Sequence, residues 1–100
     1  MLKMIKKVIC KDGFSMSVQA NSTSYCHPRE SNAKRYKEVE IGYPSSEEEL
    51  IMEYAEDSTV PTETVYAYVP APVVTMVIAK HGGMVDGELP AGIPCLRAQL

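Results

Sequence analysis

The chain has 100 residues, of which 45% are hydrophobic and 23% are charged, and its formal net charge is −3. This length predicts one domain, which buries roughly 60–65% of the surface that the unfolded chain exposes. The ordinary composition excludes disorder of the whole chain, and residues 1–10 lack the long apolar run of a secretory leader or a membrane span.

The charges are segregated along the sequence. Residues 1–37 carry eight cations and two carboxylates, residues 38–63 carry nine carboxylates and no cation, and residues 64–100 balance at zero. Two interpretations are open. Either the two blocks lie side by side and neutralise each other, or they form patches of opposite sign, of which the acidic one meets a basic partner surface.

The first predicted element is an N-terminal β-hairpin. Residues 5–10 and 14–20 have strand character, and the second segment alternates apolar and polar residues. The dipeptide Asp12-Gly13 between them is typical of a two-residue type I′ turn. Such a turn pairs Ile9 with Met16, so that both side chains face the core.

A long polar loop and a third strand follow. Residues 21–34 form the predicted loop, whose length is unusual in a compact domain and often functional. The third predicted strand covers residues 36–43, where Val39, Ile41 and Tyr43 share one face. This alternation indicates a strand with one side buried.

Residues 46–55 are predicted to form a helix. Ser46 is the predicted N-cap, and Glu49 three residues later completes a capping box. The apolar residues of the segment form one arc on a helical wheel. Glu48, Glu49 and Glu53 are expected to face away from that arc, towards solvent.

The next segment combines a fourth strand with a second helix. Residues 64–69 are the predicted strand, with Tyr66 and Tyr68 on one face. Residues 72–81 are the predicted helix, because a proline opens the segment and a glycine follows it. Its β-branched residues leave a strand as the alternative. His81 at its end is expected to be a packed, hydrogen-bonded residue rather than a catalyst.

This order of elements predicts an α+β fold. We expect a small, mostly antiparallel sheet of about four strands, which begins with the N-terminal hairpin and has two short helices packed on one face. Residues 1–83 form this domain. Residues 84–100 form an irregular C-terminal tail that docks on the domain or on a second subunit, so a homo-oligomer is open.

The polar loop offers a candidate ligand site. Tyr25 presents a stacking face, and Arg29 and Arg35 present guanidinium groups that suit phosphate or carboxylate. Together with His27 they would surround a small nucleotide-like anion. The alternative is that Pro28 shapes an ordinary surface turn without a ligand.

A second candidate site is an acidic surface for a partner protein. It lies on the predicted helix 46–55 and the residues directly after it, where complementary charge would speed the encounter with a basic groove. The alternative is an ordinary solvated helix face. The predicted contact residues are Glu47, Glu48, Glu49, Glu53, Glu56 and Asp57.

Tyr66 and Tyr68 extend this candidate surface. Aromatic residues on an open sheet face stack bases in RNA-binding sheets, but the acidic chain makes nucleic acid an unexpected partner. Tyrosine is enriched in protein interfaces, so a protein contact is predicted. The alternative is that the C-terminal tail covers both rings.

No residue set predicts catalysis, a metal or a cofactor. Cys10, Cys26 and Cys95 are odd in number and widely spaced, which indicates reduced thiols, and the predicted hairpin places Cys10 on the outer face. Neither Cys10 nor Cys26 lies in a nucleophile motif. Cys26 and His27 are the closest pair of metal-ligand types, whereas zinc sites usually contain ligand pairs at wider, regular spacing.

Five short stretches carry a resemblance: residues 13–15 (GFS), 25–29 (YCHPR), 39–44 (VEIGYP), 66–70 (YAYVP) and 79–83 (AKHGG). In these the chain resembles small uncharacterised proteins encoded by tailed bacteriophages and prophages. The resemblance covers residues 5–83 and implies a bacterial host cytoplasm during infection. It also implies inhibition of host or defence machinery, either by binding a protein or by sequestering a small signal molecule, and it carries no catalytic residue.

These observations predict a non-enzymatic phage accessory protein that acts by binding. Its partner would be a host or anti-phage defence protein with a basic surface, which the acidic surface would inhibit. The alternative is a protein that binds or sequesters a small nucleotide-like anion, as a monomer or an oligomer, through the loop 25–35. No membrane partner is expected.

Overall fold

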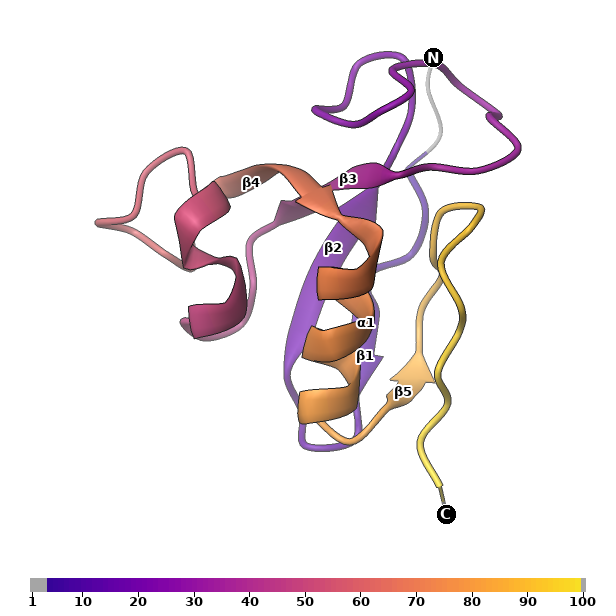
Figure 1. Cartoon of the computed structure of the whole chain (residues 1–100). Helices are drawn as coiled ribbons and strands as arrows, with labels where there is room; N and C mark the ends of the chain where they lie inside the picture. The colour runs from indigo at the N-terminus through magenta and orange to yellow at the C-terminus, as the bar shows by residue number, and fades with distance from the viewer. Residues whose placement is uncertain (1–3, 100) are drawn as a thin grey trace.

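The computed structural model describes residues 4–99 as a five-stranded antiparallel sheet with one α-helix and one 3₁₀ helix (Figure 1). The strand order across the sheet is β4-β3-β2-β1-β5. Lys3 of the basic block and Leu100 of the predicted tail lie outside the described residues. The elements are β1 (Val8–Cys10), β2 (Ser15–Gln19), β3 (Glu38–Gly42), η1 (Glu49–Tyr54), β4 (Val65–Pro70), α1 (Ala71–Lys80) and β5 (Met84–Asp86).

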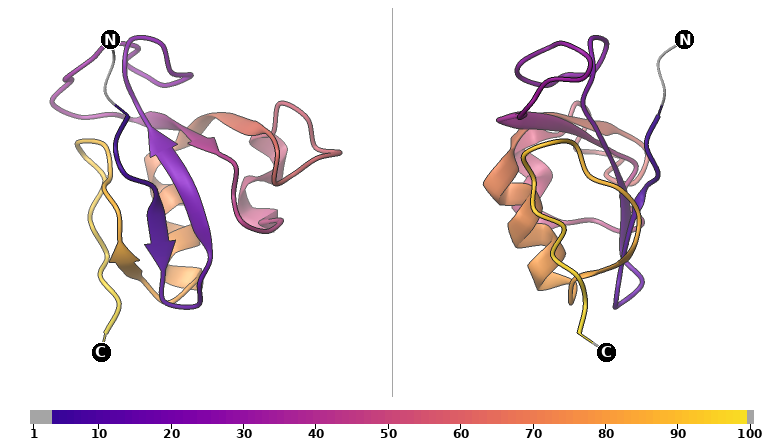
Figure 2. Two further views of the ribbon diagram at one scale, coloured as in Figure 1. Left: turned by 180° about the vertical axis from the view of Figure 1, so that it is seen from behind. Right: turned by 90° about the vertical axis from the view of Figure 1, so that its right-hand side faces the viewer.

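The predicted α+β class is confirmed, with five strands instead of about four. The helix α1 covers one face of the sheet, as the side view in Figure 2 shows. Apolar side chains of β1, β2, β3, β4 and α1 form the core of the domain. Among the described residues, no helix has both the length and the apolar content that crossing a membrane requires. The core includes Val8, Met16, Val18, Val39, Ile41, Tyr66, Val74, Val77 and Ile78.

The N-terminal hairpin forms, but its predicted register is wrong. Val8, rather than Ile9, pairs with Met16, because the loop contains three residues instead of two. The amide of Gly13 donates to the carbonyl of Cys10, and Gly13 has a φ of 95°, as a type I turn followed by a bulge requires. The one-residue shift exchanges the two faces of β1, so Cys10 is 1% exposed and lies in the core.

The strand β3 is shorter than the predicted strand 36–43. Val39 and Ile41 are buried as expected. Tyr43 lies beyond the end of β3 with a φ of 48° and is exposed, so its predicted place beside Val39 and Ile41 is wrong. A positive φ interrupts the extended conformation on which the alternation of faces depends.

The predicted common face of Tyr66 and Tyr68 is also wrong. Ile41 pairs with Tyr66 and Val39 pairs with Val69, so three steps along β4 match two steps along β3. Tyr68 adopts a φ of 53° within this bulge. As a result Tyr66 points into the core at 0% exposure, whereas Tyr68 turns outward at 42% exposure.

The predicted helix 46–55 is a shorter 3₁₀ helix with a different cap. The carboxylate of Glu48 accepts a hydrogen bond from the amide of Leu50 at 2.9 Å, so Glu48 and not Ser46 is the N-cap. Ile51 is buried as the inward residue of η1. The expected outward orientation of Glu48 is wrong, because this side chain is 1% exposed.

The helix α1 confirms the predicted second helix, and the strand alternative is wrong. Its inward arc consists of Val74, Val77 and Ile78, all fully buried. The helix ends because Gly82 and Gly83 both adopt a φ of 90°, and the amide of Gly83 donates to the carbonyl of Ile78 at 2.9 Å.

Residues 84–99 lie along the domain. The prediction of an irregular tail is wrong at its start, because residues 84–86 form β5, which pairs with β1 at the edge of the sheet. Met84 also makes a parallel bridge to Arg97, and Ile93 is buried. The tail does not cover Tyr68, which is exposed.

Thiol reactivity tests the hairpin register. Cys10 and Cys26 are buried, and burial raises the pKa of both thiols, to about 11 for Cys10, whereas Cys95 is exposed. Iodoacetamide at neutral pH should therefore modify Cys95 well before the other two, which peptide mass spectrometry measures. The unfolded protein, in which all three cysteines should react, is the control. Reaction of Cys10 as fast as Cys95 would instead support the two-residue loop.

Candidate functional site

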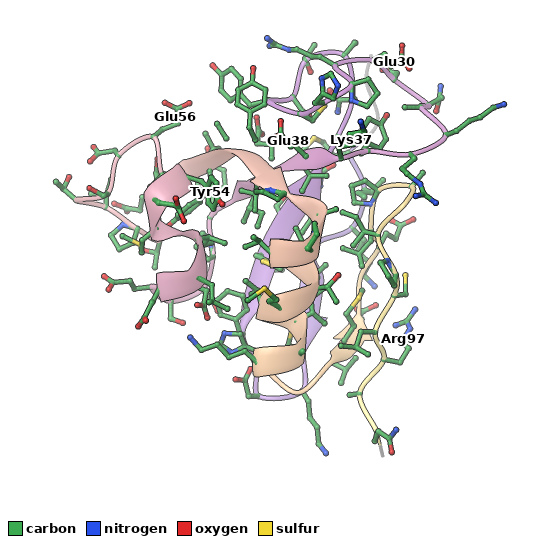
Figure 3. The ribbon with its side chains drawn as sticks, viewed as in Figure 1. Glu30, Lys37, Glu38, Tyr54, Glu56 and Arg97 are labelled. Atoms are coloured by element: carbon green, nitrogen blue, oxygen red, sulfur yellow. The ribbon has the colours of Figure 1, made fainter. Side chains whose placement is uncertain are left out.

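An acidic lobe adjoins β4, the edge strand of the sheet. We define it as residues 47–63, which comprise η1 and the projecting loop that follows it (Figure 1). Within residues 4–99 no ion pair joins the acidic lobe to a cation of the basic block. Figure 3 shows Glu56 pointing outward from this lobe. The exposed carboxylates are Glu47, Glu49, Glu53, Glu56, Asp57 and Glu63.

The loop of the acidic lobe is ordered by its own side chains. Asp57 Oδ1 accepts hydrogen bonds from the amide and the hydroxyl of Thr59, at 3.0 and 2.6 Å. These bonds lower the pKa of Asp57. The hydroxyl of Thr64 accepts from the amide of Asp57 at 3.1 Å. Tyr66 donates its hydroxyl to the carbonyl of Pro61 at 2.7 Å, which ties the loop to the core.

Glu48 is the one carboxylate of the predicted contact set that points inward. Its Oε2 accepts from the amide of Leu50 and, at 3.0 Å, from Nζ of Lys80. Its Oε1 lies 2.7 Å from Nε2 of His81. Burial disfavours its charge, but the bonds from Leu50, His81 and Lys80 together lower the pKa of Glu48. Glu48 is therefore an internal anion and does not contribute to the exposed acidic surface.

His81 lies between two carboxylates. Its Nδ1 is 2.6 Å from Oδ2 of Asp12, its Nε2 is bonded to Glu48, and the ring of Phe14 stacks on it at a centroid distance of 4.0 Å. Burial opposes protonation, but the bonds to Asp12 and Glu48 together raise the pKa of His81. Both ring nitrogens lie against carboxylate oxygens, and this arrangement favours the protonated imidazolium. We call Asp12, Phe14, Glu48, Lys80 and His81 the His81 cluster.

The His81 cluster joins three segments that are distant in sequence. Asp12 belongs to the β1–β2 turn, Glu48 caps η1, and Lys80 and His81 end α1. The hydrogen bonds from the Phe14 amide and from His81 lower the pKa of Asp12. Because both ring nitrogens of His81 are engaged, the ring has no nitrogen left to accept a substrate proton. This geometry confirms the expectation that His81 is hydrogen-bonded and supports a structural role.

Neither Cys10 nor Cys26 has an activated thiol, and no metal site assembles within residues 4–99. Burial and the nearby carboxylate of Asp12 raise the pKa of Cys10 to about 11, so its thiol is protonated at neutral pH. The thiol of Cys26 donates to the carbonyl of Asn21 at 3.3 Å, and burial raises its pKa. No three His, Cys, Asp or Glu side chains gather in metal-binding geometry over this part of the chain.

Tyr25 replaces Tyr66 as the neighbour of Tyr68. The amide of Tyr68 donates to the carbonyl of Tyr25, and the two rings lie 6.0 Å apart. The guanidinium of Arg29 lies 5.3 Å from the ring centroid of Tyr25, within the range of a cation–π contact. Sequence alternation could not reveal this pair, because the bulge in β4 creates it.

The predicted ligand set is only partly brought together. Tyr25 and Arg29 are in contact, whereas His27 is held by backbone hydrogen bonds to Glu38. Arg35 packs against Gly92 of the C-terminal segment. A single anion site made of Tyr25, His27, Arg29 and Arg35 stays a prediction.

Known proteins offer no guide to this site. No protein-family model, no curated protein and no solved structure matches the chain. Its function is therefore inferred from the geometry of its own residues.

The pH dependence of stability tests the His81 cluster. The folded state holds a raised His81 pKa, so it keeps a proton that the unfolded state loses above the ordinary value of 6.5. The free energy of unfolding should therefore fall as pH rises from 6.5, by up to about 1.4 kcal/mol per pH unit. Since the Glu48 pKa is lowered, the contribution of that carboxylate is lost only as pH falls below 4.5. Urea titrations at pH values from about 3 to 8.5 measure both trends.

The two histidines give a matched pair of variants for this test. In His81→Gln the free energy of unfolding should fall by about 3 kcal/mol at pH 6, mostly because the buried charge of Glu48 loses a partner. The decrease of stability with pH above 6.5 should also disappear. His27→Gln, which changes the exposed histidine, should keep the stability at pH 6 and its decrease above pH 6.5. An unchanged slope in His81→Gln would show that His81 is not the titrating group.

Proposed function

We propose that this chain is a non-enzymatic protein that acts by binding, and that the acidic lobe is its contact surface. The observation that carries the proposal is the set of exposed carboxylates on one ordered projection without a cation partner in residues 4–99. Crowding like charges costs stability, and that cost is recovered when a basic surface docks.

The anchoring of the acidic lobe supports a binding role over a merely solvated face. Glu48 and Tyr66 fix its two ends to the core, through the His81 cluster and through the carbonyl of Pro61. A surface that is ordered before binding loses less conformational entropy when its partner docks. The exposed pair Tyr25 and Tyr68 supplies an aromatic contact in place of the predicted Tyr66 and Tyr68.

The partner class follows from the sign of the charge. A row of carboxylates presents to a basic groove what a nucleic-acid backbone presents, so the best candidates are proteins with a nucleic-acid-binding or otherwise cationic groove. The resemblance to small phage proteins supports a host or defence protein in a bacterial cytoplasm as that partner. Inhibition would result from occupation of the groove.

Neutralising the acidic lobe tests this proposal. The variant Glu49→Gln, Glu53→Gln, Glu56→Gln should lose captured proteins that the unaltered chain retains from a nuclease-treated bacterial lysate. The reason is that long-range attraction to a cationic groove depends on these charges. Quantitative mass spectrometry at low and high salt measures the loss, and retention by the unaltered chain should weaken with salt.

A control of equal net charge excludes a general charge effect. Met4→Lys, Val85→Lys, Leu96→Lys adds the same three positive units at exposed apolar positions outside the acidic lobe. This control should keep the partner. If the neutralised lobe retains the same proteins as the control, the acidic lobe is not the contact surface.

A further inference from the structure

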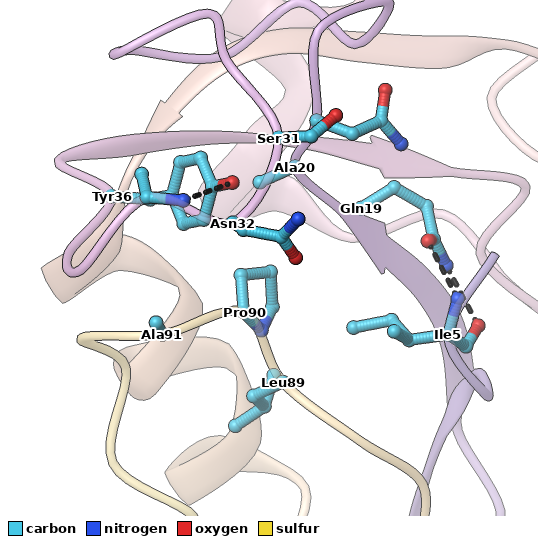
Figure 4. A pocket seen from close by; sticks show the side chains of 11 residues that line it. Ile5, Gln19, Ala20, Ser31, Asn32, Tyr36, Leu89, Pro90 and Ala91 are labelled. Atoms are coloured by element: carbon cyan, nitrogen blue, oxygen red, sulfur yellow. Dashed lines mark hydrogen bonds between the residues drawn. The ribbon is translucent and has the colours of Figure 1, made fainter. Parts of the chain in front are cut away.

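A pocket of about 660 Å³ lies on the side of the molecule where the polar loop meets the C-terminal segment (Figure 4). Four segments that are distant in sequence form its walls: the stretch before β1, the end of β2, the loop of residues 21–36, and residues 89–91. Its volume falls within the usual range for small-molecule sites. The apolar part of its wall consists of Ile5, Ala20, Ala33, Leu89, Pro90 and Ala91.

Two carboxamides in the wall have hydrogen-bonding groups to spare. Asn21 is 8% exposed; its Oδ1 accepts from the amide and hydroxyl of Thr23, and its NH₂ group has no hydrogen-bond partner among residues 4–99. The Asn32 side chain makes no hydrogen bond within the described chain, and Figure 4 shows it between the Tyr36 ring and Pro90. A carboxamide both donates and accepts, so this pair suits a ligand with alternating donors and acceptors.

The remaining polar groups of the wall are engaged. The Gln19 carboxamide bonds the amide and the carbonyl of Ile5, at 3.0 and 2.9 Å. The Tyr36 hydroxyl donates to the carbonyl of Glu30 at 2.7 Å and accepts from the amide of Ala33. These bonds hold the wall in shape, so the pocket exists before a ligand arrives.

Among residues 4–99 no charged side chain lines the pocket, but the residues next to its lining in sequence are mostly cationic. Directly beside the lining residues in sequence stand four cations, Lys6, Lys34, Arg35 and Lys37, against two carboxylates, Glu30 and Glu88. Lys6 pairs with Asp86, whereas Lys34, Arg35 and Lys37 form no ion pair within residues 4–99. An anionic group therefore suits the neighbourhood of these unpaired cations and not the interior of the pocket.

We infer that this pocket binds a nucleotide, with its heterocyclic base inside and its phosphate held by the neighbouring cations Lys34, Arg35 and Lys37. The interior has the character that a base requires: apolar walls, an aromatic residue, and carboxamides that pair with the donors and acceptors of a base edge. A simple inorganic anion has no cation inside the pocket, and an acyl chain would leave both carboxamides without partners. This site uses the polar loop, but not Tyr25, His27 or Arg29, and it does not depend on the acidic lobe.

Calorimetric titration of the unaltered chain with AMP, GMP, CMP and UMP tests the inference. At least one of the four should bind, and the corresponding nucleoside should bind roughly tenfold more weakly, because it lacks the phosphate. Inorganic phosphate alone should show no binding. If none of the four nucleotides binds at millimolar concentration, or if phosphate binds as well as the nucleotide, the inference is wrong.

Three variants assign the binding to this pocket. Asn32→Ala should weaken nucleotide binding roughly tenfold through loss of hydrogen bonds to the base. Lys34→Ala with Lys37→Ala should remove the advantage of nucleotide over nucleoside. Ala33→Leu should fill the pocket and abolish binding. Each variant is compared at equal folded fraction, measured by urea unfolding.

The neutralised acidic lobe, Glu49→Gln, Glu53→Gln, Glu56→Gln, is the matched control and should bind the nucleotide as the unaltered chain does. Unchanged affinity in Asn32→Ala and Ala33→Leu would place the nucleotide elsewhere and overturn the inference. Partner capture is tested with the acidic-lobe variant and nucleotide binding with the pocket variants. A negative result for one proposal therefore leaves the other proposal unaffected.

Discussion

The buried carboxylate of Glu48 is the constraint on which the arrangement of this small protein depends. A charge at 1% exposure is tolerated only if it is paired and hydrogen-bonded, and here Leu50, Lys80 and His81 supply the donors. Asp12 binds the other ring nitrogen of His81. The hairpin turn, the cap of η1 and the end of α1 are thereby fixed to one another by charge, in a chain too short to rely on a large core.

This internal anion also explains how an acidic segment can be part of a stable fold. Its neighbours Glu47 and Glu49 point to solvent, whereas Glu48 is neutralised inside, so the acidic lobe starts from a fixed point. The far end is fixed by the Tyr66 hydroxyl on Pro61. The exposed charges are therefore displayed on an ordered projection, and this is the property that a docking surface needs.

The sequence predicted what local patterns determine and missed what distant residues decide. The helix α1 was predictable because the chain itself supplies a proline at one end and glycines at the other. The hairpin register was not, since Gly13 suits a two-residue or a three-residue loop and both registers bury apolar side chains. The bulge at Tyr68 could not be predicted, because β4 contains no glycine to indicate a positive φ. Glu48 is one of three consecutive glutamates, and the sequence does not show which of them is buried. Its burial depends on Lys80 and His81, which are distant in sequence.

The acidic lobe and the pocket lie in different parts of the molecule. The acidic lobe adjoins β4 at one edge of the sheet, whereas the walls of the pocket come from the segment before β1, the end of β2, the loop 21–36 and residues 89–91 after β5. The acidic lobe repels an anionic ligand, and the cations near the pocket attract it. A basic protein surface is attracted by the acidic lobe and repelled by those cations. Two binding surfaces of opposite sign on one domain would therefore not compete, and each would exclude the ligand of the other.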